Sequence, residues 1–322
     1  MLKILFTMYK PNIGIIGAGW IASKYLDAIY QKKIFNLFAI SSRTKEKSIY
    51  LKKKYKIKKV FDNYKNMFLD ENIDAYILLV SAENINTLIE DLIKNKKPFL
   101  TEKPIVLNYG KTKKLLSLLN KYKTKNMVAM NRRYYSIFDK GLKILKNKGK
   151  ILGITIEGHE RFFNINKKDY NNDVYKNWIY ANSCHTIDLL RFFCGDVKKI
   201  TSYNTKYKKR KSNFAVNIKF KNGAIGNYLS YWYSPGGWSV TVFGEGITLS
   251  FKPLENGVYY YKNMKQIKIS KNINDQKFKE GIFYMLLDFK KLITNKKVSE
   301  KFENIQNHVK TLEIIKEIYD EK

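Results

Sequence analysis

The chain has 322 residues, of which 44% are hydrophobic, and this length is enough for two domains that each bury a core. Its 61 lysines and arginines outnumber 28 acidic residues and give a formal net charge of +33. Because the lysines are spread over almost every predicted surface segment, we expect non-specific, salt-sensitive attraction to polyanions and no specific nucleic-acid partner. No apolar stretch is long enough to predict a membrane span, so we expect no membrane partner.

The first residues and the cysteines indicate the compartment. Residues 1–8 are apolar but include Lys3 and lack a small-residue cleavage site, so they do not predict a signal peptide. Cys184 and Cys194 lie ten residues apart on a predicted helix, which fits a reducing cytoplasm better than a disulfide framework. We therefore expect a cytoplasmic protein. The three histidines are too scattered for a metal site, and we expect none; they are His159, His185 and His308.

In chain order, the first informative stretch is 13–22, where an apolar run breaks into glycine and resumes at helical spacing. Gly17 and Gly19, with a small residue three positions later, fit the G-x-G-x-x-G/A pattern of a dinucleotide-binding turn. The first glycine allows the tight turn, and the second leaves space for a pyrophosphate. The N–H groups at the helix start, at Trp20 and Ile21, would face the phosphates. Ordinary turns also contain this pattern, so the prediction of a dinucleotide site depends on the strand predicted before it and the helix predicted after it.

The first 130 residues alternate short apolar runs with amphipathic segments, which is typical of β-α-β units and a parallel sheet. Segments 44–54 and 83–94 are helical in pattern. We therefore expect a dinucleotide-binding Rossmann domain over residues 1–130. Its predicted strands are 12–16, 35–41, 59–61, 75–80, 98–101 and 127–130.

Beyond residue 149 the pattern changes to period-two alternation, which predicts a large, mostly antiparallel sheet. Turn signals stand at 222–223 and 244–246. We expect an α+β domain over 131–322 for substrate binding and oligomerisation, whose last helices can pack back on the first domain. The cleft between the domains is the expected active site. The predicted strands are 153–160, 197–203, 214–220, 225–233, 239–243 and 247–251, and the predicted helices are 183–193, 276–294 and 304–319.

Four stretches together resemble the glucose-fructose oxidoreductase / inositol dehydrogenase (Gfo/Idh/MocA) family. They are the glycine turn, TEKP at 101–104, NRRY at 131–134 and CHTIDLLRF at 184–192. The resemblance covers nearly the whole chain. It implies a Rossmann domain followed by an open, mostly antiparallel sheet, and nicotinamide-dependent redox chemistry on sugars, sugar derivatives or nucleotide sugars. It also implies a homodimer or homotetramer, because the exposed face of the large sheet commonly forms subunit contacts in this family.

The cofactor preference is predicted from the end of the second strand. An acidic residue there would accept from the adenosine ribose and favour NAD, whereas a small residue beside an arginine suits the 2′-phosphate of NADP. This chain has Ser42 and Arg43 there. Alternatively, Arg43 merely begins the next helix of a lysine-rich protein. We expect NADP, with NAD as the less favoured cofactor.

Two residues are the expected catalytic groups. Lys103 follows the fifth parallel strand, where doubly wound sheets bind ligands, and its ammonium can donate to a substrate oxygen. The family resemblance of the TEKP motif supports this role. It also implies that Glu102 and Lys103 contact the cofactor, and that the peptide bond between Lys103 and Pro104 is often cis in the family. His185 is the second group, as general acid/base, since imidazole moves protons near neutral pH. The alternatives are a surface lysine and a structural histidine that caps the helix.

One departure from the family puts the chemistry in doubt. The family commonly has an aspartate four residues before the histidine, and this chain has Ala181. Asp188 could orient His185, but helical spacing favours a structural pair with Arg191. Asn182 could bind the substrate by hydrogen bonds, although it cannot act as a base.

The expected substrate contacts are few. Arg132 and Arg133 follow the sixth strand and could hold a carboxylate or phosphate, and of the two we assign Arg133. Trp178 could stack on a sugar or base. The most economical function is an NADP(H)-dependent oxidoreductase acting on a CH–OH group of a sugar or nucleotide sugar, in surface-polysaccharide or glycan biosynthesis. The alternatives are a cofactor-binding family member that has lost redox chemistry and, suggested by charge alone, a nucleic-acid-binding protein.

Overall fold

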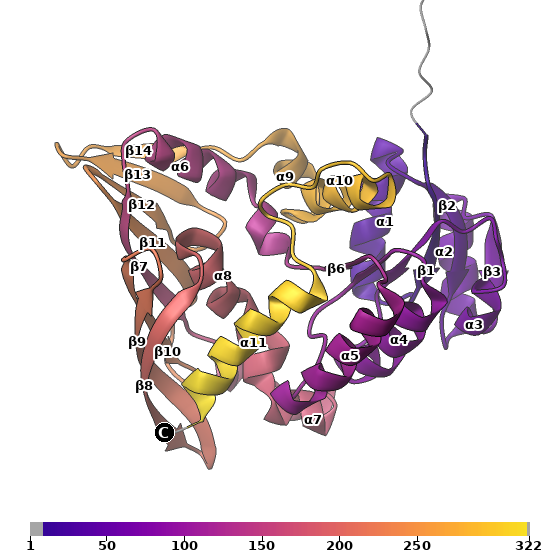
Figure 1. The fold of residues 1–322 in the computed structure, drawn as a ribbon, viewed down its shortest axis with the longest axis horizontal. Helices are drawn as coiled ribbons and strands as arrows, with labels where there is room; N and C mark the ends of the chain where they lie inside the picture. The colour runs from indigo at the N-terminus through magenta and orange to yellow at the C-terminus, as the bar shows by residue number, and fades with distance from the viewer. Residues whose placement is uncertain (1–8, 321–322) are drawn as a thin grey trace, which may run out of the picture.

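The computed structural model describes residues 9–320, so residues 1–8, for which no signal peptide is predicted, lie outside the described part. The chain forms a parallel sheet of six strands and a second sheet of eight strands, with helices between them (Figure 1). Both sheets were expected from the sequence. An α/β Rossmann fold followed by an α+β region with a large, mostly antiparallel sheet is therefore confirmed.

The six-stranded sheet has the order β3-β2-β1-β4-β5-β6, and every neighbouring pair is parallel. This is the doubly wound order, whose ligand site lies at the carboxyl ends of the strands where the order reverses, between β1 and β4. The strands are β1 Asn12–Ile16, β2 Asn36–Ser41, β3 Lys59–Phe61, β4 Ala75–Leu78, β5 Phe99–Thr101 and β6 Asn126–Val128. The helices of this half are α1 Trp20–Lys32, α2 Lys45–Tyr55, α3 Tyr64–Met67, α4 Ala82–Asn95 and α5 Thr112–Tyr122.

The two faces of this sheet belong to different cores. Ile16 and the buried side of α4 lie in one hydrophobic cluster, which continues into the second sheet. Ile13 and Ile15 lie in the other, together with α1 and with α10 (Ile282–Ile293) from near the end of the chain. A late segment therefore completes the core of the first half and fixes the two halves against each other.

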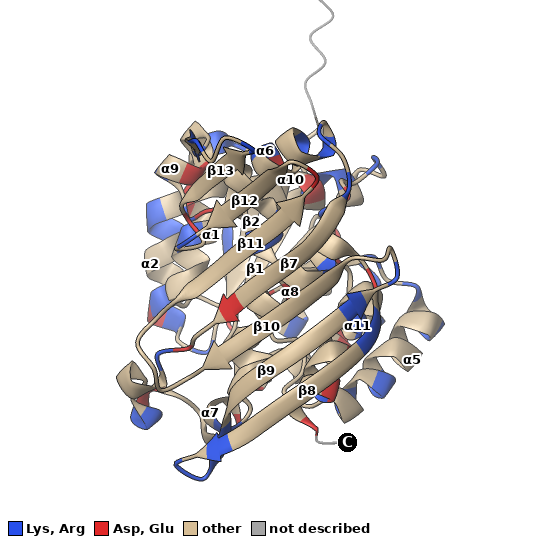
Figure 2. Cartoon of the chain, turned by 90° about the vertical axis from the view of Figure 1, so that its left-hand side faces the viewer, with Lys and Arg blue, Asp and Glu red and all other residues tan. Residues whose placement is uncertain are grey.

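The eight-stranded sheet has the order β14-β13-β12-β11-β7-β10-β9-β8 and is antiparallel except where β10 pairs with β7. Helices α6 (Ser136–Lys146), α8 (Cys184–Cys194) and α11 (Ile305–Tyr319) lie between it and the parallel sheet (Figure 1). Its outer face carries no helix (Figure 2). The strands are β7 Ile151–Gly158, β8 Val197–Tyr207, β9 Arg210–Phe220, β10 Ile225–Tyr231, β11 Trp238–Gly244, β12 Ile247–Phe251, β13 Gly257–Tyr261 and β14 Gln266–Ile269.

The prediction of one long helix over 276–294 is wrong. The segment holds two helices, α9 (Ile273–Lys277) and α10, separated by Gly281. Gly281 has φ +77°, and a Cβ there would collide with the carbonyl oxygen of Asn131. The break therefore places the start of α10 against the loop after β6.

Three further features were considered from the sequence: the cysteines, membrane-spanning helices and the distribution of positive charge. Cys184 and Cys194 are buried free thiols at the two ends of α8. Within residues 9–320, no helix is both long and apolar enough to cross a membrane. Lysine and arginine are distributed over many helices and loops (Figure 2).

Candidate active site

The glycine turn joins β1 to α1 at the carboxyl edge of the parallel sheet. Gly17 has φ +112°, and a Cβ there would collide with the Leu79 carbonyl oxygen, so only glycine allows β1 and β4 to approach this closely. Gly19 is the N-cap of α1 without a side-chain cap, and a Cβ on it would meet no atom within 4 Å. The turn thus leaves open space in front of uncapped helical N–H groups, at Trp20 and Ile21, which fits a bound pyrophosphate.

A cavity of about 470 Å³ lies beside this turn. It brings together four of the predicted cofactor residues, namely Gly17, Gly19, Ser42 and Arg43. The Ser42 hydroxyl donates to the Thr44 carbonyl oxygen at 2.7 Å, which holds the loop after β2. The Arg43 side chain is exposed and has no ion pair within the described residues.

The sequence analysis missed one acidic side chain in this cavity. Asp62 follows β3 and lines the cavity, but its carboxylate is 2.8 Å from the Lys45 ammonium. Lys47 also lines the cavity. The charge at this end of the cavity is therefore positive in spite of Asp62.

A second cavity, of about 310 Å³, lies between the parallel sheet and α8. Val80 lines both cavities, so the second lies next to the first. The residues that line it come from the start of α1, from the loops after β4, β5 and β6, and from the segments that lead into α8 and α10. It brings together six predicted site residues, namely Trp20, Ile21, Glu102, Lys103, Asn182 and His185.

Lys103 lies just beyond the carboxyl end of β5. Its ammonium donates to the Ala181 carbonyl oxygen at 2.9 Å, and its peptide bond to Pro104 is cis. Glu102 accepts from the Tyr25 hydroxyl at 2.6 Å and from the Lys103 backbone N–H at 3.2 Å. Burial raises the pKa of Glu102, and the Tyr25 hydrogen bond opposes this rise. Glu102 therefore fixes the loop and is not available as a free counter-ion for Lys103.

His185 lies in the first turn of α8, directly after a π-helical segment, Ile179–Ser183. Its side chain is buried, and its Nδ1 atom has no hydrogen-bond partner within residues 9–320. Burial lowers the pKa of His185 well below its usual range, and the charges of Arg132 and Lys103 lower it further. The imidazole is therefore neutral near pH 7 and can accept a proton.

Asn182 is oriented by a buried carboxylate that the sequence analysis did not identify. Glu160 accepts from the Asn182 amide nitrogen at 2.6 Å, from the Ser183 hydroxyl at 2.6 Å and from the Trp178 indole N–H at 2.8 Å. Burial raises the pKa of Glu160, and these donors oppose the rise. Since an ionised carboxylate only accepts, the Asn182 amide nitrogen faces Glu160 and its carbonyl oxygen remains for the cavity.

Two predicted substrate residues do not reach this cavity. Trp178 is buried, donates to Glu160, and packs edge-on against Phe162 and Tyr170, so it belongs to an aromatic core. Arg133 is also buried, with its guanidinium turned away from the cavity, whereas its neighbour Arg132 lines the cavity. Both residues stand in a short 3-10 helix, Asn131–Tyr134, where consecutive side chains point in different directions.

Arg133 instead holds a buried ionic network. Its Nε and Nη2 atoms donate to both Asp188 oxygens at 2.6 and 2.7 Å, and Nη1 donates to Glu303 at 2.7 Å. Arg191 donates to Glu303 at 2.9 Å. The predicted pair of Asp188 with Arg191 is therefore wrong, because Glu303 takes Arg191 and leaves Asp188 to Arg133. Burial raises the pKa of Asp188, but Arg133 outweighs it and holds that pKa below its usual range.

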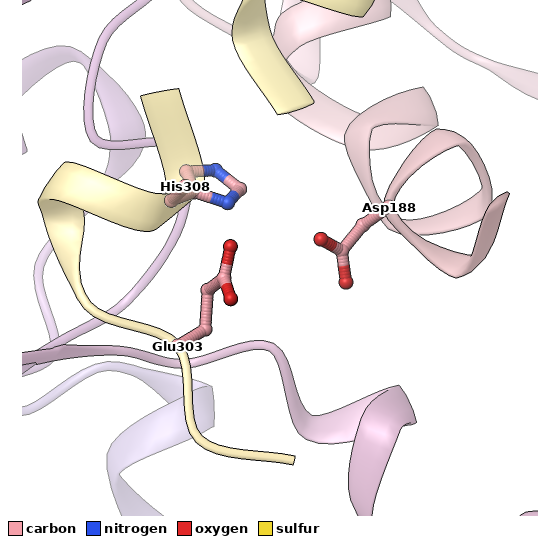
Figure 3. Close-up of side chains that lie close together, drawn as sticks. All are labelled: Asp188, Glu303 and His308. Atoms are coloured by element: carbon pink, nitrogen blue, oxygen red, sulfur yellow. The ribbon is translucent and has the colours of Figure 1, made fainter. Parts of the chain in front are cut away.

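His308 completes this network. Asp188, Glu303 and His308 point toward one another from α8, the loop before α11, and α11 itself (Figure 3). Their ligand atoms lie within 4.8 Å of one another, which is a spacing that metal sites use. However, both carboxylates already bind guanidiniums, and burial lowers the pKa of His308 to about 4, so the ring is neutral. The two carboxylates and two guanidiniums therefore balance without an ion.

The geometry of the site indicates a class of protein. A glycine turn that fits a dinucleotide, next to a cavity lined by a lysine and a neutral histidine, is typical of two-domain nicotinamide oxidoreductases. Residues 11–130 match the oxidoreductase family with an NAD-binding Rossmann fold, and residues 149–250 match the GFO/IDH/MocA C-terminal domain. The two matches together cover more than half of the chain, which therefore belongs to the Gfo/Idh/MocA family.

Individual relatives are distant. A myo-inositol 2-dehydrogenase from Thermotoga maritima is 27% identical over 135 residues, which are 42% of this chain and 39% of that protein. The chain spans less than half the length of the curated relatives it matches.

Solved structures share the fold over nearly the whole chain. An Agrobacterium radiobacter oxidoreductase in complex with NAD+, L-tartaric acid and magnesium has a TM-score of 0.78 at 16% identity, covering 97% of this chain and 96% of that one. UDP-N-acetylglucosamine 3-dehydrogenase from Acidithiobacillus ferrooxidans has a TM-score of 0.75 at 13% identity, covering 97% of each chain. At these identities the likeness shows the fold alone.

Proposed function

We propose that this chain is a cytoplasmic, NADP(H)-dependent oxidoreductase that acts on a CH–OH group of a sugar or nucleotide sugar in glycan biosynthesis. One observation carries the proposal: the cavity beside the glycine turn is adjacent to a second cavity that Lys103 and His185 both line. We propose residues 1–130 as the dinucleotide-binding domain and 131–322 as the substrate and oligomerisation domain.

The residues of the second cavity have separate tasks. The bound nicotinamide ring would accept or supply the hydride. His185, held neutral by burial, takes the proton from the substrate hydroxyl when the alcohol is oxidised and returns it in the reverse direction. Lys103 donates a hydrogen bond to the same oxygen. The Asn182 carbonyl oxygen, turned toward the cavity by Glu160, accepts from a further substrate hydroxyl.

The preference for NADP rests on the end of β2. Ser42 and Arg43 stand where an acidic residue would favour NAD, and Lys47 adds positive charge to the same cavity. The one carboxylate that lines this cavity, Asp62, is paired with Lys45. An exposed guanidinium with no ion pair within the described residues suits a 2′-phosphate, which it can bind through two parallel hydrogen bonds.

Arg43→Asp tests this preference. We expect the parent protein to bind NADPH more tightly than NADH, and the variant to lose about 10- to 100-fold in NADPH affinity while NADH affinity changes little. The measurement is fluorescence titration with each nucleotide. Lys52→Asp makes the same charge change on the exposed side of α2 and should leave both affinities unchanged. Equal parent affinities, or an Arg43→Asp variant that still prefers NADPH, would assign the cofactor to NAD or to both.

We also propose that the chain forms a homodimer or homotetramer through the outer face of the large sheet. No helix covers this face (Figure 2), and large apolar side chains on it are exposed. An open apolar face of this kind usually marks an interaction site. The exposed side chains are Leu152, Tyr203, Ile225, Tyr231 and Phe243.

Light scattering after size-exclusion chromatography tests the assembly. We expect a mass of two or four times the 38.0 kDa chain, and a shift toward the monomer in Ile225→Glu, because a carboxylate would be buried without a partner. Ile49→Glu adds the same charge at another exposed isoleucine and should not change the mass. A single 38.0 kDa species in the parent protein would contradict the proposal.

A further inference from the structure

The second cavity is lined by more positive than negative side chains. Lys103, Arg132 and Lys279 all line it and are half-buried. Within residues 9–320 none of them makes an ion pair. The one carboxylate that lines the cavity is Glu102, so it offsets one of these three positive charges; its hydrogen bonds come from the neutral Tyr25 hydroxyl and a backbone N–H. Lys103 meets only the neutral carbonyl oxygen of Ala181.

Other carboxylates near the cavity lie outside its lining. Glu280 lies next to Lys279 in sequence but pairs with Lys271 at 2.9 Å. Glu255 accepts from the Tyr135 hydroxyl at 3.4 Å. Burial lowers the pKa of Lys279, and the charge of Arg132 lowers it further, whereas Glu280, Glu102 and Glu255 oppose this fall.

This excess is not explained by the lysine-rich surface. Exposed lysines are solvated and cost little, but partly buried cations are costly unless they are paired. The chain pairs its buried cations elsewhere: Arg133 and Arg191 are matched by Asp188 and Glu303. Three cations and one carboxylate thus line the cavity that His185 also lines, and this concentration of positive charge favours the binding of an anion there.

Arg132 is the residue best placed to hold that anion. Its guanidinium lies 4.5 Å from the centre of the Trp238 ring, and its Nε atom is buried without a hydrogen-bond partner. The Trp238 ring centre is also 6.2 Å from that of His185. A guanidinium stacked on an aromatic ring keeps its edge free for two parallel hydrogen bonds to a carboxylate or phosphate. Lys279 lies over Trp20, 5.6 Å from its ring centre, and adds a second cation.

We propose that the substrate carries an anionic group, a carboxylate or a phosphate, which Arg132 and Lys279 bind while Lys103 and His185 act on the reacting oxygen. The inference rests on the proposed function and narrows its substrate class to sugar acids or phosphorylated sugars. The pyrophosphate of the cofactor is the competing anion, because Trp20 and Ile21 line the second cavity as well. The NADPH affinity of Arg132→Gln decides between the pyrophosphate and an anionic substrate.

The test compares matched sugars on the full chain saturated with NADP+. The probes are D-glucose, D-glucuronate and D-glucose 6-phosphate, with binding followed by calorimetry and turnover by NADPH absorbance. We expect at least one anionic probe to bind about 10-fold or more tightly than D-glucose, and more weakly as salt rises. Glucuronate and glucose 6-phosphate distinguish a carboxylate from a phosphate. Arg132→Gln should remove about 10- to 100-fold of the anionic probe's affinity.

Two controls separate the possible failures. Lys146→Gln removes one charge from an exposed position and should leave the affinities unchanged, whereas Arg132→Gln should leave NADPH affinity within about 2-fold of the parent. If D-glucose binds as tightly as both anionic probes, or if Arg132→Gln weakens NADPH and the anions alike, the inference is wrong. If the parent binds no nicotinamide nucleotide, the proposed function fails. Titration of the anions without cofactor then still decides whether Arg132 holds them.

Discussion

Replacing Lys103 or His185 by alanine is expected to lower turnover by at least about 100-fold while NADPH binding is retained, since one positioned acid/base group contributes roughly 100- to 10,000-fold. Both side chains line the second cavity, whereas the glycine turn and Arg43 line the first. The loss should therefore appear in kcat and kcat/KM together, as for interactions made mainly in the transition state. Steady-state kinetics with NADPH absorbance gives the comparison.

Alanine variants of another lysine and another histidine serve as controls. Lys97 is also a half-buried lysine whose ammonium donates to a backbone carbonyl oxygen, that of Asp70 at 3.0 Å, but it lines neither cavity. Lys97→Ala and, for the histidine, His159→Ala should keep turnover near that of the parent. Normal turnover in His185→Ala would make His185 structural. A parent protein that binds NADPH but turns over none of the probes would favour the alternative of a family member without redox chemistry, to which Ala181 points.

The direction of the His185 pKa adds a pH signature. Because burial and nearby cations lower this pKa, the neutral base persists below the usual histidine range, and proton acceptance is lost only when pH falls through the lowered value. The acidic limb of kcat/KM for alcohol oxidation should therefore lie below pH 6.5, the ordinary histidine value. An acidic limb above this value would place another group in the role.

Arg133→Met is expected to cost about 3–5 kcal/mol of unfolding free energy, because it leaves Asp188 and Glu303 buried without their shared cation. Both carboxylates are almost fully buried, so water cannot replace the guanidinium. Arg133→Lys keeps the charge but cannot reach three oxygens with a planar fork, so it should lose less. Urea denaturation measures the difference at equilibrium.

A surface pair and a kinetic readout complete this test. Lys146 and Glu300 form an ion pair of 3.2 Å with side chains 64% and 91% exposed, and Lys146→Met should cost no more than about 1 kcal/mol. Where Arg133→Lys still folds, its KM for substrate should equal that of the parent. An unchanged stability with a raised KM would return Arg133 to the substrate role that the sequence first suggested.

The predicted elements agree best where the signal is local. The glycine turn, the strands of the parallel sheet and the helix that carries His185 follow from short patterns of glycine and apolar spacing. β13 and β14 were not predicted, because β13 is half-buried along most of its length and β14 is only four residues long. β13 shows no period of two, and the alternation of β14 is too short to stand out.

The residues of the candidate site also divide into those that local motifs identify and those that they do not. Motifs placed Lys103 and His185, and the structure gives both the same cavity. Glu160 was hidden because it stands at the end of a predicted strand, where nothing local distinguishes a buried carboxylate from an exposed one. Lys279 was hidden among many lysines.

By itself the sequence determined the glycine turn and the positions of the parallel strands, because each depends on neighbours within a few positions. The family resemblance of its motifs picked out Lys103 and His185 as the groups expected to move protons. Only the tertiary structure decided which arginine of the pair 132–133 faces the cavity. Asp188 and Glu303, which stand 55 and 170 positions from Arg133, bind its guanidinium and so leave Arg132 to the cavity. Partners this distant are brought together by the packing of α8 and α11, and no spacing in the chain encodes that contact.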